Sequence, residues 1–281
     1  MTMHRSPGPD AIRESAKGYK MKSSIKCLVG IALAAASTVA AFASRAAPAS
    51  AAGPGNTTVV LVHGAFADGS GWSEVIRLLQ DRGLNVVAVQ NPLTSLADDV
   101  AATRRVLDAQ AGPVVLVGHS WGGVVISEAG VHERVKSLVY VAAFAPSEGQ
   151  SVADLTKGYP TPPGSKFVVA DKAGFLSLSP EGMAMHFAQD LPAAQTGLMT
   201  VTQVPIRASS FEERPQAAAW RTRPTWYVLT QNDHMIDPGL QSAMARSMHA
   251  HVVSVSSSHV PQLSKPVQVA DAILSAAEQA K

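Results

Sequence analysis

The residues best suited to chemistry in this sequence surround Ser120, in the pentapeptide Gly118-His119-Ser120-Trp121-Gly122. An apolar run, 113–117, precedes it, and a stretch of small and apolar residues typical of a helix, 123–129, follows it. A strand, Gly-x-Ser-x-Gly and a helix in this order predict a sharp turn that holds the serine hydroxyl above the carboxyl end of a sheet. Glycine fits both flanking positions, because a Cβ there would collide with neighbouring backbone. The pentapeptide therefore predicts a nucleophilic serine.

A serine hydroxyl needs a base within hydrogen-bond reach and an anion that orients the base. Two apolar runs predicted as strands, 225–229 and 251–255, are followed shortly by Asp233 and by His259. Because the carboxyl ends of parallel strands meet at one edge of a sheet, we expect both residues to converge there on Ser120. Their order along the chain, Ser then Asp then His, is the one that this type of turn requires. The sequence therefore predicts a catalytic triad.

Other polar residues near these positions have simpler interpretations. Asp237 is the alternative acid, but it suits the N-cap of a helix that begins at the next residue, whereas Asp233 lies nearer the strand end. His234 is interpreted as a wall or solvent residue. His249 and His251 form a His-x-His pair without an evident third ligand, so no metal site is predicted.

Acyl transfer also needs two N–H groups that stabilise the oxyanion of the tetrahedral intermediate. One is predicted to be the backbone N–H of Trp121, which follows the serine at the start of the helix. The other is predicted in the loop after the first strand, at the N–H of Ala65, where Gly64 lets the chain bend close to the site. His63 is interpreted as a structural residue that holds this loop.

Valine-rich apolar runs alternate with helical patterns along the rest of the chain. Such runs are typical of strands buried on both faces, and their alternation with helices predicts an α/β fold with a mostly parallel sheet and right-handed crossovers. The predicted helices include 96–110, with Ser95 as its N-cap, and 266–280. The predicted strands are 57–62, 85–89, 113–117, 135–141, 225–229 and 251–255.

The stretch from about 146 to 223 interrupts this alternation. It contains turns and short amphipathic segments, and no run in it predicts a strand. Its apolar side chains need a surface to cover, which favours a small helical cap over the site rather than a long surface excursion. The residues predicted to line an apolar pocket for the acyl or alcohol part of a substrate, or alternatively to form the core of the cap, are Phe175, Leu176, Met183, Phe187 and Leu198. Phe66, in the loop after the first strand, is predicted to join this pocket.

Residues 1–51 have the pattern of an export signal and linker, which are removed or disordered. Three lysines between positions 20 and 26 precede an uncharged apolar segment, 27–43, and small-residue cleavage sites end at Ala43 and at Ala51. The apolar segment is short for a membrane span. The sequence therefore predicts export to the periplasm or the medium, without a stable membrane anchor.

Removal of these residues changes what the composition implies. The whole chain carries a formal charge of +2, but 1–51 contain seven basic and two acidic residues, so 52–281 carry −3. No excess of positive charge remains to suggest a nucleic-acid partner. The one cysteine, Cys27, belongs to the leader, so 52–281 must form its core by packing, as a single domain without disulfides.

Several of these motifs together resemble those of the α/β-hydrolase superfamily. The matching segments are His63-Gly64-Ala65 with Gly71-Trp72, Gly118 to Gly123, Asn232-Asp233 and Ser258-His259. Over 57–280 the chain is similar to the branch that contains small bacterial esterases, plant methyl-ester esterases and hydroxynitrile lyases. The resemblance implies the α/β-hydrolase fold with a cap, a serine triad and no cofactor.

The same resemblance disfavours other reactions of the superfamily. The plant hydroxynitrile lyases of this branch carry a threonine in the oxyanion loop and a lysine after the catalytic histidine, where this chain has Gly64 and Val260. Haloalkane dehalogenases and epoxide hydrolases use an aspartate nucleophile, where this chain has Ser120.

The sequence as a whole predicts an exported serine hydrolase that cleaves small-molecule carboxylic esters through an acyl-enzyme intermediate. An amidase or a lactonase with the same triad stays open as an alternative. A non-catalytic binding protein on this fold is disfavoured by the intact triad, because a binder needs no activated nucleophile. The number of subunits is not predicted.

Overall fold

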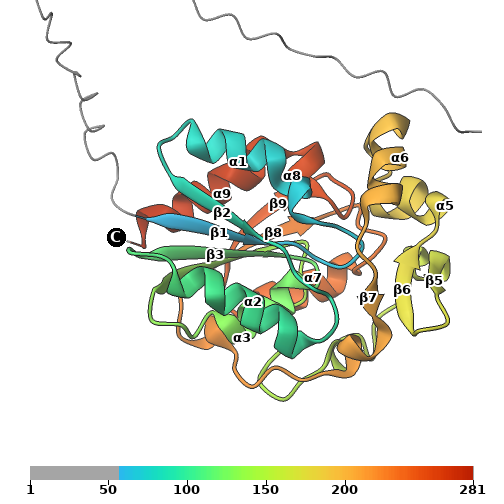
Figure 1. Ribbon diagram of the computed structural model, residues 1–281, viewed down its shortest axis with the longest axis horizontal. Coiled ribbons are helices and arrows are strands. Elements are labelled where there is room, and N and C mark those ends of the chain that lie inside the picture. Colours follow the sequence, from blue (N-terminus) through green and yellow to red (C-terminus); the bar gives the residue numbers. More distant parts are fainter. Residues whose placement is uncertain (1–56, 281) are drawn as a thin grey trace, which may run out of the picture. The chain divides into compact units, whose positions relative to one another are not determined.

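A six-stranded parallel sheet is the centre of the structure, a computed structural model that describes residues 57–280 (Figure 1). The strand order is β2-β1-β3-β4-β8-β9, and every neighbouring pair is parallel. Its strands are β1 (Thr58–Val62), β2 (Asn85–Val89), β3 (Val114–His119), β4 (Val135–Val141), β8 (Thr225–Thr230) and β9 (His251–Val255). The predicted α/β fold is confirmed, and each predicted strand lies within two residues of its observed bounds.

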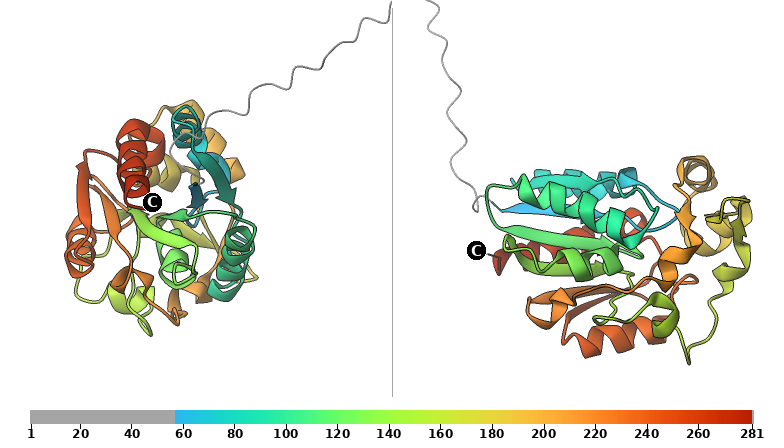
Figure 2. Two further views of the ribbon diagram at one scale, coloured as in Figure 1. Left: turned by 90° about the vertical axis from the view of Figure 1, so that its left-hand side faces the viewer. Right: turned by 60° about the horizontal axis from the view of Figure 1, so that its bottom comes forward.

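The central strands are buried on both faces, which explains their nearly continuous apolar sequence. In β1, Val59 and Leu61 pack into one hydrophobic cluster, whereas Val60 and Val62 pack into the other. Helices α1 (Ser73–Gln80) and α9 (Pro266–Glu278) cover the first of these faces, and α2 (Leu96–Asp108), α3 (Gly122–Ala129) and α7 (Pro238–Ser247) cover the second (Figures 1 and 2). Burial of alternate side chains on opposite faces fixes the register of the sheet, because a one-residue slip would exchange the two clusters.

The helices of the two outer layers begin at recognisable signals. Ser95 caps α2 by accepting the N–H of Asp98 over 3.0 Å, and Pro266 opens α9 in its first turn. The helices that cover the sheet are α1 (Ser73–Gln80), α2 (Leu96–Asp108), α3 (Gly122–Ala129), α7 (Pro238–Ser247) and α9 (Pro266–Glu278), and the short α8 (Pro261–Ser264) precedes α9. The predicted helices 96–110 and 266–280 are thus present, each ending about two residues early.

The insertion between β4 and β8 forms a cap beside the carboxyl ends of the strands (Figure 1). It contains α4 (Val152–Leu155), β5 (Val168–Ala170), β6 (Phe175–Leu178), α5 (Pro180–Gly182), a π-helical turn (Met183–Phe187), α6 (Ala193–Thr202) and β7 (Ile206–Arg207). Four short 3₁₀ turns complete the irregular parts of the chain, at Gly69–Trp72, Pro163–Phe167, Ala208–Glu212 and Ala219–Arg221.

The expectation that this insertion contains no strand is wrong. Strands β5, β6 and β7 form an antiparallel sheet of their own, so the cap is mixed rather than purely helical. The strands are two to four residues long, too short for a periodic pattern, and β6 pairs with a segment almost thirty residues further along. Only a tertiary contact defines them.

The predicted export signal and its cleavage sites lie outside the described residues. Among residues 57–280, the structure contains no helix with the length and apolar character needed to cross a bilayer.

Helix α3 approaches the sheet unusually closely through its first two residues. A Cβ on Gly122 would lie 2.5 Å from the carbonyl oxygen of Val62 and 2.9 Å from that of His63. A Cβ on Gly123 would overlap the carbonyl oxygen of Phe144. Contacts this short are forbidden, so the sequence Gly-Gly is a packing requirement of the helix start.

We expect Gly122→Ala to destabilise the protein by about 1–3 kcal/mol, because the surrounding atoms are backbone and cannot move aside cheaply. Urea unfolding at equilibrium measures this change. Gly197→Ala is the matched control: no atom lies within 4 Å of its Cβ, and it lies in the exposed interior of α6. The control should be neutral or stabilising by up to about 1 kcal/mol. Equal destabilisation by both substitutions would contradict the packing argument.

Candidate active site

Ser120 lies in a tight turn between β3 and α3, with a φ of +53° in the left-handed region that residues with a side chain seldom adopt. Its carbonyl accepts hydrogen bonds from the N–H of Gly123 (3.0 Å) and of Phe144 (3.2 Å). A Cβ on Gly118 would lie 2.5 Å from the carbonyl oxygen of Gly122. The pattern Gly-x-Ser-x-Gly is therefore a steric requirement of this turn, and the packing around it holds the strain.

Asp233 and His259, which follow β8 and β9, form a buried pair. The Nδ1–H of His259 donates to Asp233 Oδ2 over 2.8 Å. Burial opposes ionisation of Asp233, but the His259 ring and the N–H groups of Ile236 and Met235 together hold the pKa of its carboxyl below the ordinary value. The carboxylate is thus charged at neutral pH and keeps a proton on Nδ1, which leaves Nε2 able to accept another.

The two candidate acids have different roles in the structure. Asp233 Oδ1 accepts the N–H of Met235 (2.7 Å), and its Oδ2 receives His259. Asp237 is the N-cap of α7, where its carboxylate accepts the N–H of Leu240 (3.0 Å). The structure therefore brings Asp233 to the histidine and uses Asp237 to start a helix.

His119 holds the His259 backbone close to the serine turn. Its Nε2–H donates to the carbonyl oxygen of His259 over 2.8 Å, and the two rings lie 4.8 Å apart. Burial and the neighbouring His259 lower the pKa of His119 to about 3, so its ring is neutral. Sequence reasoning missed this role, because the motif leaves the residue before the serine unspecified.

Ser120 directly follows His119, which contacts His259, and the residue is 7% exposed. Within residues 57–280, no hydrogen bond joins Ser120 Oγ to the His259 ring. Catalytic hydrogen bonds of this kind are often long without substrate and tighten when it binds. The arrangement supplies a serine hydroxyl, an imidazole and a carboxylate at one edge of the sheet.

The loop after β1 is shaped by His63 and packs against the serine. The Nδ1–H of His63 donates to the Gly64 carbonyl (2.9 Å), and its Nε2 accepts the N–H of Asn91 (2.9 Å). Burial lowers the pKa of His63, which keeps this tautomer neutral. A Cβ on Gly64 would lie 2.6 Å from Ser120 Cβ. The peptide that joins Gly64 to Ala65 therefore lies beside the serine.

Trp121 starts α3, and a buried carboxylate holds its indole ring. The indole N–H donates to Asp99 Oδ2 over 2.8 Å, and Asp99 Oδ1 accepts the N–H of Leu93 over 2.8 Å. Burial raises the pKa of Asp99 to about 6. Within 57–280, neither Trp121 nor Ala65 donates its backbone N–H to another residue, so both groups are available to an oxyanion.

The residues predicted to line a substrate pocket occupy different places. Phe187 packs its ring 5.1 Å from that of His259 and 6.4 Å from that of Phe66, so these two phenylalanines adjoin the site. Met183 is fully buried, and Phe175 packs in the cap under the guanidinium of Arg207. Leu176 is partly buried against the core, and Leu198 is 62% exposed on α6.

The cap is hydrogen-bonded to both loops that carry the acid and the base. Gln189 donates its amide N–H to the carbonyl of Asn232 (2.7 Å), and Asp190 accepts the N–H of Ser258 (3.0 Å). Asn232 and Ser258 directly precede Asp233 and His259. Two consecutive cap residues thus hold both loops that carry the candidate acid and base, a link that no pattern in the sequence indicated.

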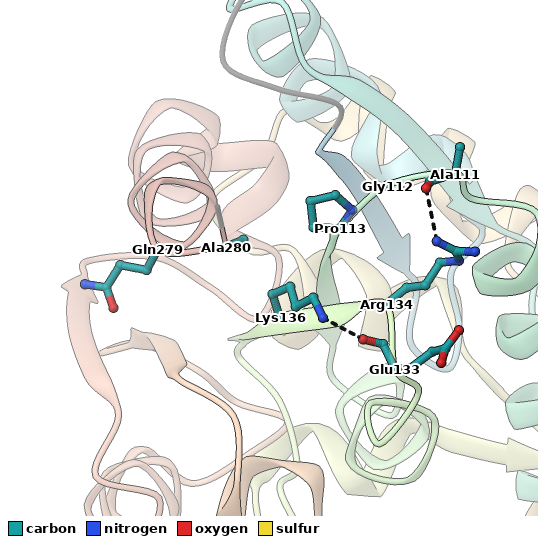
Figure 3. A pocket seen from close by; sticks show the side chains of 8 residues that line it. All are labelled: Ala111, Gly112, Pro113, Glu133, Arg134, Lys136, Gln279 and Ala280. Atoms are coloured by element: carbon teal, nitrogen blue, oxygen red, sulfur yellow. Dashed lines mark hydrogen bonds between the residues drawn. The ribbon is translucent and has the colours of Figure 1, made fainter.

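A hollow of about 590 Å³ lies at the opposite edge of the sheet (Figure 3). Its lining includes Pro113, before β3, and Lys136, in β4, so it lies at the amino ends of strands whose carboxyl ends carry the site. Arg134 and Lys136 there donate to the carbonyls of Ala111 and Glu133. The lining residues include no serine, histidine or cysteine, so this groove contains no Ser–His or Cys–His pair. Among residues 57–280, no group of three or more potential metal-binding side chains is present.

Comparison with known proteins agrees with this geometry. The sequence profile of the Alpha/beta hydrolase family matches residues 59–272. A pyrethroid hydrolase of Sphingobium wenxiniae is 27% identical over 249 residues, 77% of this chain and 86% of that protein. A chloroplastic Arabidopsis thaliana protein named as a methylesterase is 27% identical over 251 residues, 78% of this chain and 71% of that protein.

A solved structure of a pyrethroid hydrolase shares the fold, with a TM-score of 0.70 at 23% identity over 79% of this chain and 97% of that one. The relatives confirm the resemblance to the branch that contains bacterial esterases and plant methyl-ester esterases. This chain is therefore a hydrolase and belongs to the alpha/beta hydrolase family.

Proposed function

We propose that this protein is a serine esterase in which Ser120, His259 and Asp233 form the catalytic triad. The observation that carries the proposal is the buried Asp233–His259 hydrogen bond, 2.8 Å long, next to a serine in a strained Gly-x-Ser-x-Gly turn. A charged carboxylate and a neutral imidazole in this order activate a serine hydroxyl. No metal or cofactor takes part in the proposed reaction.

The reaction proceeds in two stages. Ser120 Oγ attacks the ester carbonyl carbon while His259 Nε2 takes the hydroxyl proton, and Asp233 stabilises the resulting imidazolium. The N–H groups of Ala65 and Trp121 bind the oxyanion of the tetrahedral intermediate. The C–O bond to the alcohol then breaks, and His259 delivers its proton to the leaving oxygen. Water, activated by the same histidine, releases the acid from Ser120.

The names of the relatives favour an ester as the substrate, because they include a pyrethroid hydrolase and a methylesterase. The structure offers little for the cyanohydrin chemistry of the lyases in this branch. A threonine at position 64 would collide with Ser120, since even a Cβ there comes within 2.6 Å of Ser120 Cβ. Val260, after the histidine, is buried and carries no charge that could hold cyanide.

Replacing the nucleophile tests the proposal directly. We expect Ser120→Ala to lower kcat for p-nitrophenyl butyrate by roughly 10⁴–10⁶-fold with the fold retained. A fluorophosphonate probe should label Ser120 alone in the wild type. Ser73→Ala, on the exposed surface of α1, is the control and should behave as wild type. Labelling at another serine, or activity of Ser120→Ala near the wild-type rate, would refute the assignment.

The acid is tested by a pair of matched substitutions. Asp233→Asn should lower kcat by about 10⁴-fold, because the amide cannot stabilise the imidazolium and favours the wrong histidine tautomer. Asp237→Asn should change kcat less than about twofold, because asparagine caps a helix as well as aspartate does. Steady-state kinetics of both variants decide the question. If Asp237→Asn were the more damaging, the acid would be misassigned.

Reaction class is tested with a second substrate. With mandelonitrile, we expect cyanide release no faster than in buffer, while p-nitrophenyl butyrate is hydrolysed. The physical reason is that Gly64 supplies no hydroxyl to bind the cyanohydrin and Val260 supplies no cation to bind cyanide. A cyanide electrode measures the release, with Ser120→Ala as the background. Serine-dependent cyanide release faster than ester hydrolysis would assign the protein to the lyases.

A further inference from the structure

A small, mostly apolar pocket of about 40 Å³ is lined by residues that flank the proposed catalytic groups. Two of its walls adjoin the proposed machinery in sequence, since Phe66 follows Ala65 and Val260 follows His259. A third wall is Phe187, whose ring packs against the His259 ring. Met199 and Leu263 add to the apolar lining. This pocket is therefore placed to receive one end of a bound ester, and its volume limits that end to a few heavy atoms.

One polar side chain in the lining has no partner. Gln262 is 3% exposed, and its amide makes no hydrogen bond within residues 57–280; the carbonyl oxygen is fully buried. A buried amide without a partner loses its hydrogen bonds to water and gains none in return. Such a group is uncommon in a folded protein and calls for an explanation.

Gln241, Gln203 and Gln189 each use their side-chain amide in at least one hydrogen bond, although Gln189 Oε1 also lacks a partner; Gln262 uses neither atom of its amide within residues 57–280. Gln241 donates to Asp233 (2.8 Å) and accepts the N–H of Thr230 (3.1 Å). Gln203, in the cap, accepts the N–H of Leu178 (2.8 Å) and donates to its carbonyl (2.9 Å). A structural role for the Gln262 amide would leave comparable hydrogen bonds, and none is present among the described residues.

We propose that Gln262 is a specificity-determining residue that hydrogen-bonds a hydroxyl group on the part of the ester held in this pocket. The inference rests on the esterase function proposed above and adds the substrate class, short esters that carry a hydroxyl. A hydroxyl both donates and accepts, so it satisfies the amide whichever end of the amide faces the ligand. The apolar walls contact the short carbon chain that bears the hydroxyl.

Three esters of similar size test the proposal and locate the hydroxyl. Ethyl butyrate has none, ethyl 3-hydroxybutyrate has one on the acyl part, and 2-hydroxyethyl butyrate has one on the alcohol part. We expect the wild-type enzyme to prefer one hydroxy ester over ethyl butyrate by at least about tenfold in kcat/KM, which is the effect of one well-placed hydrogen bond. Which hydroxy ester is preferred identifies the part of the ester in the pocket.

Gln262→Leu keeps the approximate size of the side chain and removes the amide. In this variant we expect the ratio of kcat/KM for the preferred hydroxy ester to kcat/KM for ethyl butyrate to fall by at least about tenfold. The fall should come mainly from a higher KM for the hydroxy ester, because the lost contact forms in the bound substrate as well as in the transition state. Gln268→Leu, an exposed glutamine on α9, is the matched control and should keep the ratio. Thermal unfolding of both variants shows that they are folded.

Failure of the proposed role of Gln262 and failure of the proposed esterase function give different results. Absence of any preference for a hydroxy ester in the wild type, or an equal fall of kcat/KM for all three esters in Gln262→Leu, would overturn the role of Gln262 while leaving the esterase proposal intact. Failure of the wild type to hydrolyse any of the three esters, together with no labelling of Ser120 by a fluorophosphonate, would instead overturn the proposed function.

Discussion

The close approach of backbone to backbone around Ser120 is the constraint on which the rest of the site depends. Helix α3 can begin at Gly122 only because that residue and Gly118 have no Cβ to separate the helix from β1 and from the turn itself. The same absence at Gly64 lets the loop after β1 lie against Ser120. Three glycines from two segments thus bring Ser120, the start of α3 and the loop after β1 together. A methyl group at any one of them would collide with the neighbouring atoms and separate these parts.

The polar groups that complete the site are buried, and each is stabilised by a specific partner. Asp233 stays charged because His259 and backbone N–H groups compensate for its burial. His63 and His119 stay neutral because burial disfavours their cationic forms, and each then uses its ring to hold a piece of backbone in place. All three histidines are buried, so their partners distinguish them: His63 and His119 bond backbone groups, whereas His259 bonds the carboxylate of Asp233.

The cap takes part in the site as well as covering it. Hydrogen bonds from Gln189 and Asp190 reach the residues that precede the acid and the base, and Phe187 packs on the catalytic imidazole. A movement of the cap would therefore change both access to the site and the geometry of the triad. The sequence of the cap must satisfy these contacts in addition to any contact with a substrate, which explains why some of its large apolar side chains are buried in its own core.

The sequence by itself determined the layers of the fold and the order of the candidate triad, because nearly continuous apolar runs, helix caps and the glycine pattern around Ser120 are local signals. It also favoured Asp233 over Asp237 by their distances from the strand end; in the structure Asp233 bonds His259 and Asp237 caps α7. Only the tertiary structure decided the strands of the cap, the support of Trp121 by Asp99, and the unpaired amide of Gln262. These features are contacts, or missing contacts, between segments far apart in the chain. Their energies depend on which groups the fold brings within a few ångströms of each other, and not on the residues adjacent in sequence.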